Sequence, residues 1–311
     1  MTDNVTPIVI KRRAERFKLG IVGWGFVGKA VDYAFTTDNV DKFIVDPKYN
    51  SNTLNDLVEW QPNIVFICAP TPSNDDGSVD VSIIRETIAA LLAGSSSFIV
   101  IKSTMTPDTI QEVCLHDGRI VYNPEFLTES NSKADFVTSR FNLIGCTDPG
   151  AATYLEGVYS NFSICNGMQS ITMSPVEASF FKYTLNTFLA MKVTYMNQLK
   201  QVMDEYGGSF NNLSRALGVD GRMGHTHMKI PGTDGKKGFG GACFPKDLDA
   251  FIHFVGNKTN QDFTLLKQVR EVNNKIRSQY ELSEREIAQN VNYGQTKEEL
   301  EDQDNGSAVE K

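Results

Sequence analysis

The sequence predicts an α/β fold, a doubly wound parallel β-sheet followed by a long helix and a small all-helical domain. Short β-branched runs alternate with helical patterns from residue 18 to about residue 165, which is typical of a parallel sheet with helices on both faces. A single helical pattern of about 30 residues follows, and glycine-rich and helical segments continue to about residue 287. We therefore expect domains at 18–170 and 171–289.

The first region supplies the strands of the sheet. The expected strands are residues 18–22, 42–45, 63–69, 97–102, 119–122 and 141–146, and helical periodicity fills intervening segments such as 26–35 and 81–92. Residues 1–17 are interpreted as an N-terminal extension. Residues 290–311 are polar, acidic and almost free of aromatic side chains, so we predict a disordered tail.

The long helix begins at a strong start signal. Ser174 can cap it, Pro175 suits the first helical position, and Glu177 can complete a capping box. Gly207-Gly208 ends the pattern. A helix of about 45 Å is too long for one small domain, so we expect it to link domains or support a homodimer.

Composition excludes several classes of function. The 311 residues are 41% hydrophobic, enough for a substantial buried core, the length suits about two domains, and the formal net charge is −8. Such a balance offers no basic surface for nucleic acid, and no apolar run reaches the roughly 20 residues that cross a bilayer. The N-terminus lacks the apolar centre of a signal peptide. We expect a cytoplasmic protein with neither nucleic acid nor membrane as a partner.

A glycine loop predicts a dinucleotide site. Gly23-Trp24-Gly25-Phe26-Val27-Gly28 follows an expected strand and opens an expected helix, the Rossmann-type arrangement in which backbone N–H groups meet a pyrophosphate. Asp46 ends the next strand and can accept hydrogen bonds from ribose hydroxyls, which favours NAD over NADP. The alternative is a glycine-rich turn that binds nothing.

The five cysteines are an odd number without a CxxC pair, so we expect neither a disulfide framework nor a metal site. Four of them are interpreted as small buried hydrophobes: Cys68, Cys114, Cys146 and Cys165. Cys243 differs because glycines and charges surround it in Gly240-Gly241-Ala242-Cys243-Phe244-Pro245-Lys246-Asp247. A helix beginning near Lys246, and Lys246 itself, would lower its pKa, and Asp247 could orient a base or a water. The alternative is a loop cysteine packed against Phe244.

Two further groups of residues are candidates for chemistry. Lys182 and Asn186 share one face of the long helix in apolar surroundings, where an ammonium and an amide could stabilise a developing negative charge. Alternatively, the lysine reaches solvent and the asparagine bonds to backbone. The second group consists of hydroxyl and carboxylate side chains that follow expected strands, where each segment could equally be a simple turn. These residues are Thr71 in Pro70-Thr71-Pro72, Thr104 in Lys102-Ser103-Thr104, and Glu125 and Glu129 in Asn123-Pro124-Glu125-Phe126-Leu127-Thr128-Glu129.

Together these segments resemble the UDP-glucose/GDP-mannose dehydrogenase family, in the same order from residue 18 to about residue 277. The aromatic Phe244 is more similar to UDP-glucose 6-dehydrogenases than to GDP-mannose enzymes. The resemblance implies oxidation of a nucleotide sugar's C6 alcohol to a carboxylate with two NAD and one water. It implies a nucleophilic Cys243 that forms a thiohemiacetal and then a thioester.

The resemblance also implies roles for the other residues. Lys182, Asn186 and Asp247 would stabilise the oxyanion and hold water, Glu125 would be the general acid/base, and Thr104 would order the water. Cofactor contacts would come from Gly23, Gly25, Phe26, Val27, Gly28, Asp46, Thr71, Thr104, Glu129 and Lys246. Substrate contacts would come from Glu125, Phe126, Leu127, Lys182, Asn186, Gly240 and, from the second subunit of a homodimer, Arg222.

Three departures from the family pattern stand out. The family continues into a third α/β domain that binds the nucleotide, and this sequence passes instead into the acidic tail. The loop 230–237 is a few residues longer than usual, and Ser51 stands where a lysine often follows the ribose-binding acid. Besides a UDP-glucose enzyme, the sequence allows another nucleotide-sugar 6-dehydrogenase such as a GDP-mannose enzyme, a two-electron hydroxyacid dehydrogenase, or a non-catalytic NAD-binding subunit.

Overall fold

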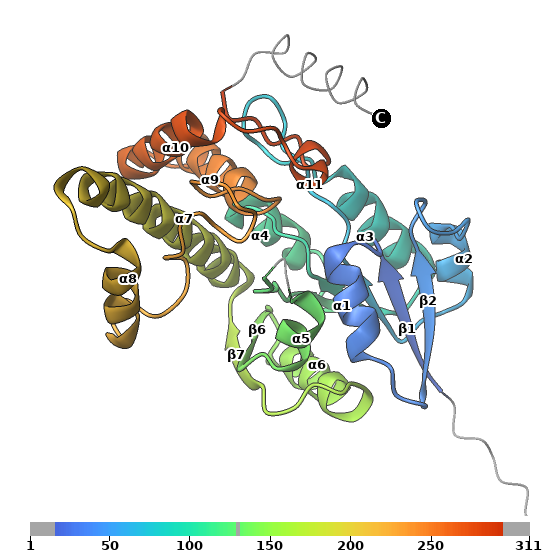
Figure 1. The fold of residues 1–311 in the computed structure, drawn as a ribbon. Helices are drawn as coiled ribbons and strands as arrows, with labels where there is room; N and C mark the ends of the chain where they lie inside the picture. The colour runs from blue at the N-terminus through green and yellow to red at the C-terminus, as the bar shows by residue number, and fades with distance from the viewer. Residues whose placement is uncertain (1–15, 129–130, 295–311) are drawn as a thin grey trace, which may run out of the picture.

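The computed structural model describes residues 16–128 and 131–294, in which a seven-stranded sheet is followed by a group of helices (Figure 1). The strand order is β2-β1-β3-β4-β5-β6-β7. Neighbouring strands run parallel except β5 and β6, which meet antiparallel at Tyr122 and Gly145. The doubly wound α/β prediction is confirmed. The strands are β1 (Phe17–Val22), β2 (Val40–Val45), β3 (Ile64–Ile67), β4 (Phe98–Ile101), β5 (Ile120–Tyr122), β6 (Phe141–Gly145) and β7 (Gln169–Met173).

Helices α1 to α6 belong to the sheet domain, and α7 leads into the helical domain. The helices are α1 (Phe26–Ala34), α2 (Leu54–Glu59), α3 (Ser82–Gly94), α4 (Pro107–Leu115), α5 (Ser132–Val137), α6 (Pro149–Phe162), α7 (Pro175–Tyr206), α8 (Phe210–Val219), α9 (Phe244–Lys258), α10 (Thr264–Arg277) and α11 (Glu284–Ile287). Among the described residues, none of these helices combines the length and apolarity that a membrane crossing needs.

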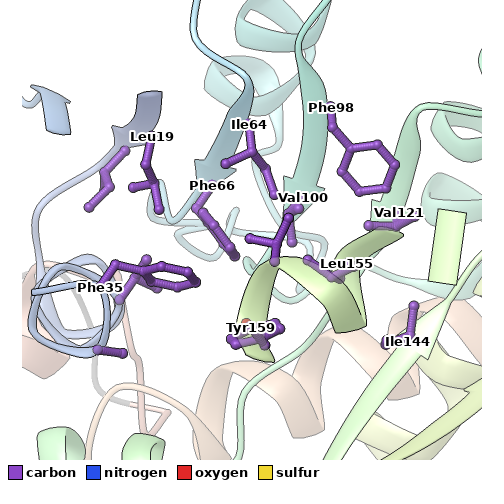
Figure 2. Close-up of a cluster of buried hydrophobic side chains, with 14 of the residues drawn as sticks. Leu19, Phe35, Ile64, Phe66, Phe98, Val100, Val121, Ile144, Leu155 and Tyr159 are labelled. Carbon is purple, nitrogen blue, oxygen red and sulfur yellow. The ribbon is translucent and has the colours of Figure 1, made fainter. Parts of the chain in front are cut away.

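Both faces of the sheet are buried. In β3, Ile64 and Phe66 enter one apolar cluster and Val65 and Ile67 enter the other. Figure 2 shows the first cluster, where Tyr159 of α6 lies among the strand side chains. Because successive strand residues point to opposite faces, a strand covered on both sides must be apolar throughout. This explains the uninterrupted apolar runs of the sequence.

Strand β7 is the strand that the sequence did not predict. It pairs with β6 along its whole length, yet none of its residues is fully buried. An edge strand of this kind lacks the apolar run by which buried strands are found. The sheet consequently extends to Met173, three residues past the expected domain boundary.

Helix α7 confirms the predicted long helix. Ser174 caps it and forms a capping box with Glu177, and the 32-residue helix ends at Gly207, which has φ +104°. Its first turns pack on the sheet through Ala178, and later turns contact α9 and α10. The helix therefore presents side chains to both domains.

The predicted boundary of the disordered tail is wrong. Val291 and Tyr293 are buried, and the Tyr293 hydroxyl donates a 2.6 Å hydrogen bond to Glu286. Val291 and Tyr293, together with hydrogen bonds of Asn290 and Val291, attach this part of the polar stretch to the protein. The rest of the predicted tail, residues 295–311, and most of the predicted N-terminal extension, residues 1–15, lie outside the described residues.

Candidate active site

The glycine loop joins β1 to α1 at the point where strand order reverses between β1 and β3. Gly23 has φ +87°, and a Cβ there would lie 2.7 Å from the carbonyl oxygen of Cys68. A Cβ on Gly28 would lie 2.0 Å from the Gly23 oxygen. A Cβ on Gly25 would meet nothing within 4 Å, so its backbone faces open space at a helix N-terminus. These three conditions fit a loop that packs closely against the sheet and admits a pyrophosphate.

Asp46 follows β2, as predicted, and its carboxylate is tied to the glycine loop. It accepts hydrogen bonds of 2.6 Å from the Trp24 backbone N–H and 2.9 Å from the Lys48 backbone N–H. These contacts hold the acid beside the loop, at the place where a ribose-binding acid belongs. Its contact with ribose remains a prediction.

The glycines provide a matched pair of substitutions. We expect Gly25→Ala to fold normally but to weaken dinucleotide binding about tenfold, because the new methyl group occupies space that the pyrophosphate needs. We expect Gly28→Ala to lower the free energy of unfolding by about 1–3 kcal/mol through overpacking. Urea denaturation measures the second effect. Quenching of fluorescence from Trp24, which lies within the loop, measures dinucleotide binding. Equal affinities for Gly25→Ala and the wild type would contradict the expected loss of binding.

A cluster of polar side chains lies where α7 and α9 meet the loop after β5. The Lys182 ammonium donates to the Glu125 carbonyl oxygen at 2.6 Å and lies 3.2 Å from its Oε1. The Asn186 amide donates to Asp247 Oδ2 at 2.6 Å, and the Lys246 ammonium donates to Asp247 Oδ1 at 2.6 Å. Three separate parts of the chain thus form a single polar cluster.

The cluster is buried. Lys182 is 3% exposed and Asp247 is 2% exposed, which excludes the alternative of a lysine reaching solvent. Burial by itself would lower the pKa of Lys182, but the carboxylates of Glu125 and Asp247 outweigh it and raise that pKa. The amine is therefore held as an ammonium ion, able to stabilise a negative oxygen.

Cys243 is the N-cap residue of α9, half-buried beside this cluster. Its predicted lowered pKa is wrong. Burial, reinforced by the carboxylates of Glu125 and Asp247, raises the pKa of the thiol to about 12, although Lys182 and Lys246 act in the opposite direction. The helix terminus and the two ammonium ions do not offset the desolvation of a thiolate.

This pKa sets a pH dependence in the cofactor-free protein. The pKa of the Cys243 thiol in the folded protein lies above its ordinary value of 9.0, so the protonated thiol favours the folded state. This stabilisation is complete below pH 9.0 and is lost as the pH rises toward about 12. We expect the rate of Cys243 alkylation by iodoacetamide to rise continuously between about pH 8 and 11. Peptide mass spectrometry measures that rate, and a plateau below pH 9 would contradict the expected titration.

Several of the remaining predicted residues follow the strands β3, β4 and β5. Thr71 is buried after β3, and Thr104 is half-buried between β4 and α4. After β5, the Phe126 ring lies 5.2 Å from the Lys182 ammonium, and the Leu127 N–H donates to Glu125 Oε2 at 2.6 Å. Glu129 lies outside the described residues.

Arg222 is not brought to the cluster by its own chain. Its side chain is 91% exposed and pairs with Asp220 at 2.6 Å. Its expected contact with a second subunit's site stays a prediction.

The other cysteines behave as small apolar residues. Cys114 and Cys146 are buried in the two sheet cores, and Cys68 and Cys165 are half-buried. Burial raises the pKa of each thiol, that of Cys68 and Cys114 to about 12. All five cysteines are free, and within residues 16–128 and 131–294 no group of three or more His, Cys, Asp or Glu residues could hold a metal ion.

Three buried polar residues that the sequence did not predict lie behind residues 238–243, here named the thiol loop: Asn273, Arg277 and Glu286. Asn273 exchanges two hydrogen bonds with the Phe239 backbone, of 2.8 and 3.0 Å. Arg277 pairs with Asp234 at 2.7 Å and with Glu286 at 2.9 Å. Asn273 and Arg277 are four residues apart on α10, the same spacing that singled out Lys182 and Asn186, so this signal was available.

The glycine loop and the buried cluster define the class of proteins with a dinucleotide-binding α/β fold, here with a thiol beside a buried cluster of charged side chains. Two family models match the chain: residues 48–163 match the NAD binding domain of the UDP-glucose/GDP-mannose dehydrogenase family, and residues 176–275 match its central domain. The chain belongs to this family. Its cofactor is NAD, in agreement with the glycine loop and Asp46.

Individual relatives agree with the family. A UDP-glucose 6-dehydrogenase of Pseudomonas aeruginosa is 32% identical over 225 residues, which are 68% of this chain and 48% of that protein. One of Rickettsia bellii is 31% identical over 201 residues, 62% of this chain and 45% of that protein. The chain thus spans about half the length of the curated relatives that it matches.

Solved structures give the same fold. A UDP-glucose dehydrogenase from Pyrobaculum islandicum superposes with a TM-score of 0.71 at 26% identity, covering 86% of this chain and 70% of that one. A 3-hydroxyisobutyrate dehydrogenase from Mycobacterium tuberculosis superposes with a TM-score of 0.58 at 16% identity, covering 82% of this chain and 99% of that one. At that identity, the second likeness concerns the fold alone.

Proposed function

We propose that this chain is a nucleotide-sugar 6-dehydrogenase of the UDP-glucose type, which oxidises the C6 alcohol to a carboxylate in two steps. The observation that carries the proposal is the buried cluster in which Lys182, Asn186 and Asp247 lie beside Cys243. A two-step oxidation needs a nucleophile that retains the aldehyde and cations or amides that stabilise an oxyanion, and this cluster contains both.

In this proposal, the glycine loop and Asp46 would hold NAD, which would supply the hydride acceptor for each oxidation. Glu125 takes the proton of the C6 hydroxyl, while the Lys182 ammonium and the Asn186 amide stabilise the oxygen that becomes a carbonyl. Cys243 then adds to the aldehyde and keeps it bound as a thiohemiacetal. Asp247 holds the water that later hydrolyses the thioester, with Thr104 as a second partner for that water.

The raised pKa of Cys243 gives Glu125 a second task. At neutral pH the thiol carries its proton, so addition to the aldehyde requires a base to remove that proton. Glu125 is a carboxylate whose charge acts directly on Cys243 and whose own position is held by Lys182. We propose that Glu125 first releases the C6 hydroxyl proton to solvent and is then this base, so that the thiol proton passes through Glu125 to the oxygen of the thiohemiacetal.

A stoichiometric assay tests the proposal. The purified chain is incubated with NAD and either UDP-glucose, UDP-N-acetylmannosamine or GDP-mannose, and NADH and sugar product are both quantified. Two NADH per uronate formed support the proposal and identify the nucleotide sugar. One NADH per substrate oxidised points to a two-electron dehydrogenase, and NAD binding without reduction of NAD points to a binding subunit; either result overturns it.

We further propose that two copies associate along α7. Four of the exposed large side chains on this helix are spaced seven, seven and four residues apart, so they lie along one face: Phe188, Tyr195, Val202 and Tyr206. Such an apolar stripe is suited to pairing with its own copy. We expect Tyr195→Glu to convert a dimer to a monomer in analytical ultracentrifugation, whereas Lys200→Glu, on the same helix, leaves the dimer intact. A wild-type monomer would refute the proposal.

A further inference from the structure

Residues 283–293, here named the C-terminal clasp, follow α10 and lie beyond the segment that matches the family's central domain. In Figure 1 this segment leaves the end of α10 and runs across to the sheet domain near α3 and α1. It contains the short helix α11 and the buried residues Glu286, Val291 and Tyr293. The clasp therefore joins the two domains at their active-site side.

Glu286 links the clasp to the loop that carries the thiol. Its Oε1 accepts hydrogen bonds from the Gly241 backbone N–H at 3.0 Å, from Arg277 at 2.9 Å and from Tyr293 at 2.6 Å. Its Oε2 accepts two more from Ser283, and the side chain is 1% exposed. Both carboxylate oxygens are thus fully used, and one of them holds the backbone two residues before Cys243.

The other end of the clasp is attached to the cofactor side of the sheet domain. The Gln289 carbonyl oxygen accepts a 3.0 Å hydrogen bond from the Ser73 N–H, and the Asn290 amide donates to the Ser73 oxygen at 3.2 Å. Ser73 follows the predicted cofactor residue Thr71 by two positions. The Arg285 guanidinium lies 4.6 Å from the ring of Phe26, the first residue of α1.

We propose that the clasp positions the Cys243 thiol relative to the cofactor-binding edge of the sheet, with Glu286 as the positioning residue. The importance of the thiol rests on the proposed function; the positioning itself does not. Gly241 has φ +80°, and the space beside Gly240 is filled by Arg277. The thiol loop is therefore shaped to lie against the Arg277–Glu286 pair, and removing one charge of this buried pair would leave the other charge uncompensated.

Selective alkylation of Cys243 tests this proposal. Iodoacetamide labelling with peptide mass spectrometry follows Cys243 and the buried Cys114 in the same sample. We expect Glu286→Gln to speed Cys243 alkylation about tenfold through local opening of the loop, with Cys114 unchanged. Glu284→Gln, on the exposed side of the same helix, is the control and should alter neither rate. Tyr293→Phe removes one hydrogen bond from Glu286 and should give a smaller change in the same direction, which keeps the test informative if Glu286→Gln does not fold.

The two proposals fail in distinguishable ways. Equal Cys243 alkylation in Glu286→Gln, Tyr293→Phe and wild type overturns the clasp, as does an equal increase at Cys114, which would indicate general unfolding. If the wild type oxidises nucleotide sugars, we also expect kcat of Glu286→Gln to fall about tenfold, because the Cys243 thiol is no longer held in its position. A wild type without turnover refutes the proposed function, while the alkylation rates still decide the role of the clasp.

Discussion

Replacing Cys243 with alanine is expected to reduce uronate formation by a factor of about 10⁴ or more, because the aldehyde loses the nucleophile that retains it. NAD binding should be unchanged, since the glycine loop and Asp46 hold their positions through contacts that do not include Cys243. Rapid-mixing assays of NADH and mass spectrometry of the sugar measure the loss. Quenching of Trp24 fluorescence measures the retained affinity.

The matched control for this substitution is Cys165→Ala. Cys165 is half-buried against the sheet core, where its thiol contacts the Phe136 carbonyl oxygen at 3.8 Å, so its loss should leave kcat within about twofold. Uronate formation by Cys243→Ala at a rate near that of the wild type would show that catalysis is not covalent. Equal losses in both variants would show that the effect arises from destabilised packing.

Lys182→Met is expected to affect stability and catalysis together. The substitution leaves the Glu125 carboxylate buried without its cation, which should lower the free energy of unfolding by about 3–5 kcal/mol. It also removes the ammonium that stabilises the oxyanion, so kcat should fall by about 10²–10³. Urea denaturation and steady-state kinetics on the same preparation separate the two effects.

A double substitution shows which part of that loss is electrostatic. Lys182→Met combined with Glu125→Gln removes both charges, and we expect it to recover about half of the lost stability without recovering activity. Lys200→Met serves as the control, since Lys200 pairs with Asp204 near the surface and its loss should cost less than about 0.5 kcal/mol. Recovery of activity in the double variant would mean that neither group acts on substrate.

The cofactor half of the site could be predicted because it depends on local sequence. The glycines of 23–28 and the acid at 46 sit on consecutive elements of one βαβ unit, and the geometry of that unit hardly varies. Lys182 and Asn186 were also found from sequence, because helical spacing places both on one apolar face of α7. In both cases, short-range periodicity carries the information.

The state of the thiol and the clasp could not be predicted in this way. The pKa of Cys243 depends on the balance between desolvation and four charges, which α7, the loop after β5 and α9 bring together. Tyr293 stands in a stretch whose composition indicates disorder, and its hydroxyl is held by Glu286. The burial of Glu286 depends in turn on Arg277 and on the backbone of Gly241. Residues far apart in the chain decide both features.

The sequence by itself determined the α/β class, the glycine loop of residues 23–28 between a strand and a helix, the long helix and the identity of the polar side chains. Each is encoded by residue spacing within one or two neighbouring elements. Only the tertiary structure decided that Glu125, Lys182 and Asp247 form one buried cluster beside Cys243, that burial raises the pKa of its thiol, and that residues 283–293 join the domains. Desolvation and charge pairing are properties of the assembled site, and no local pattern records them.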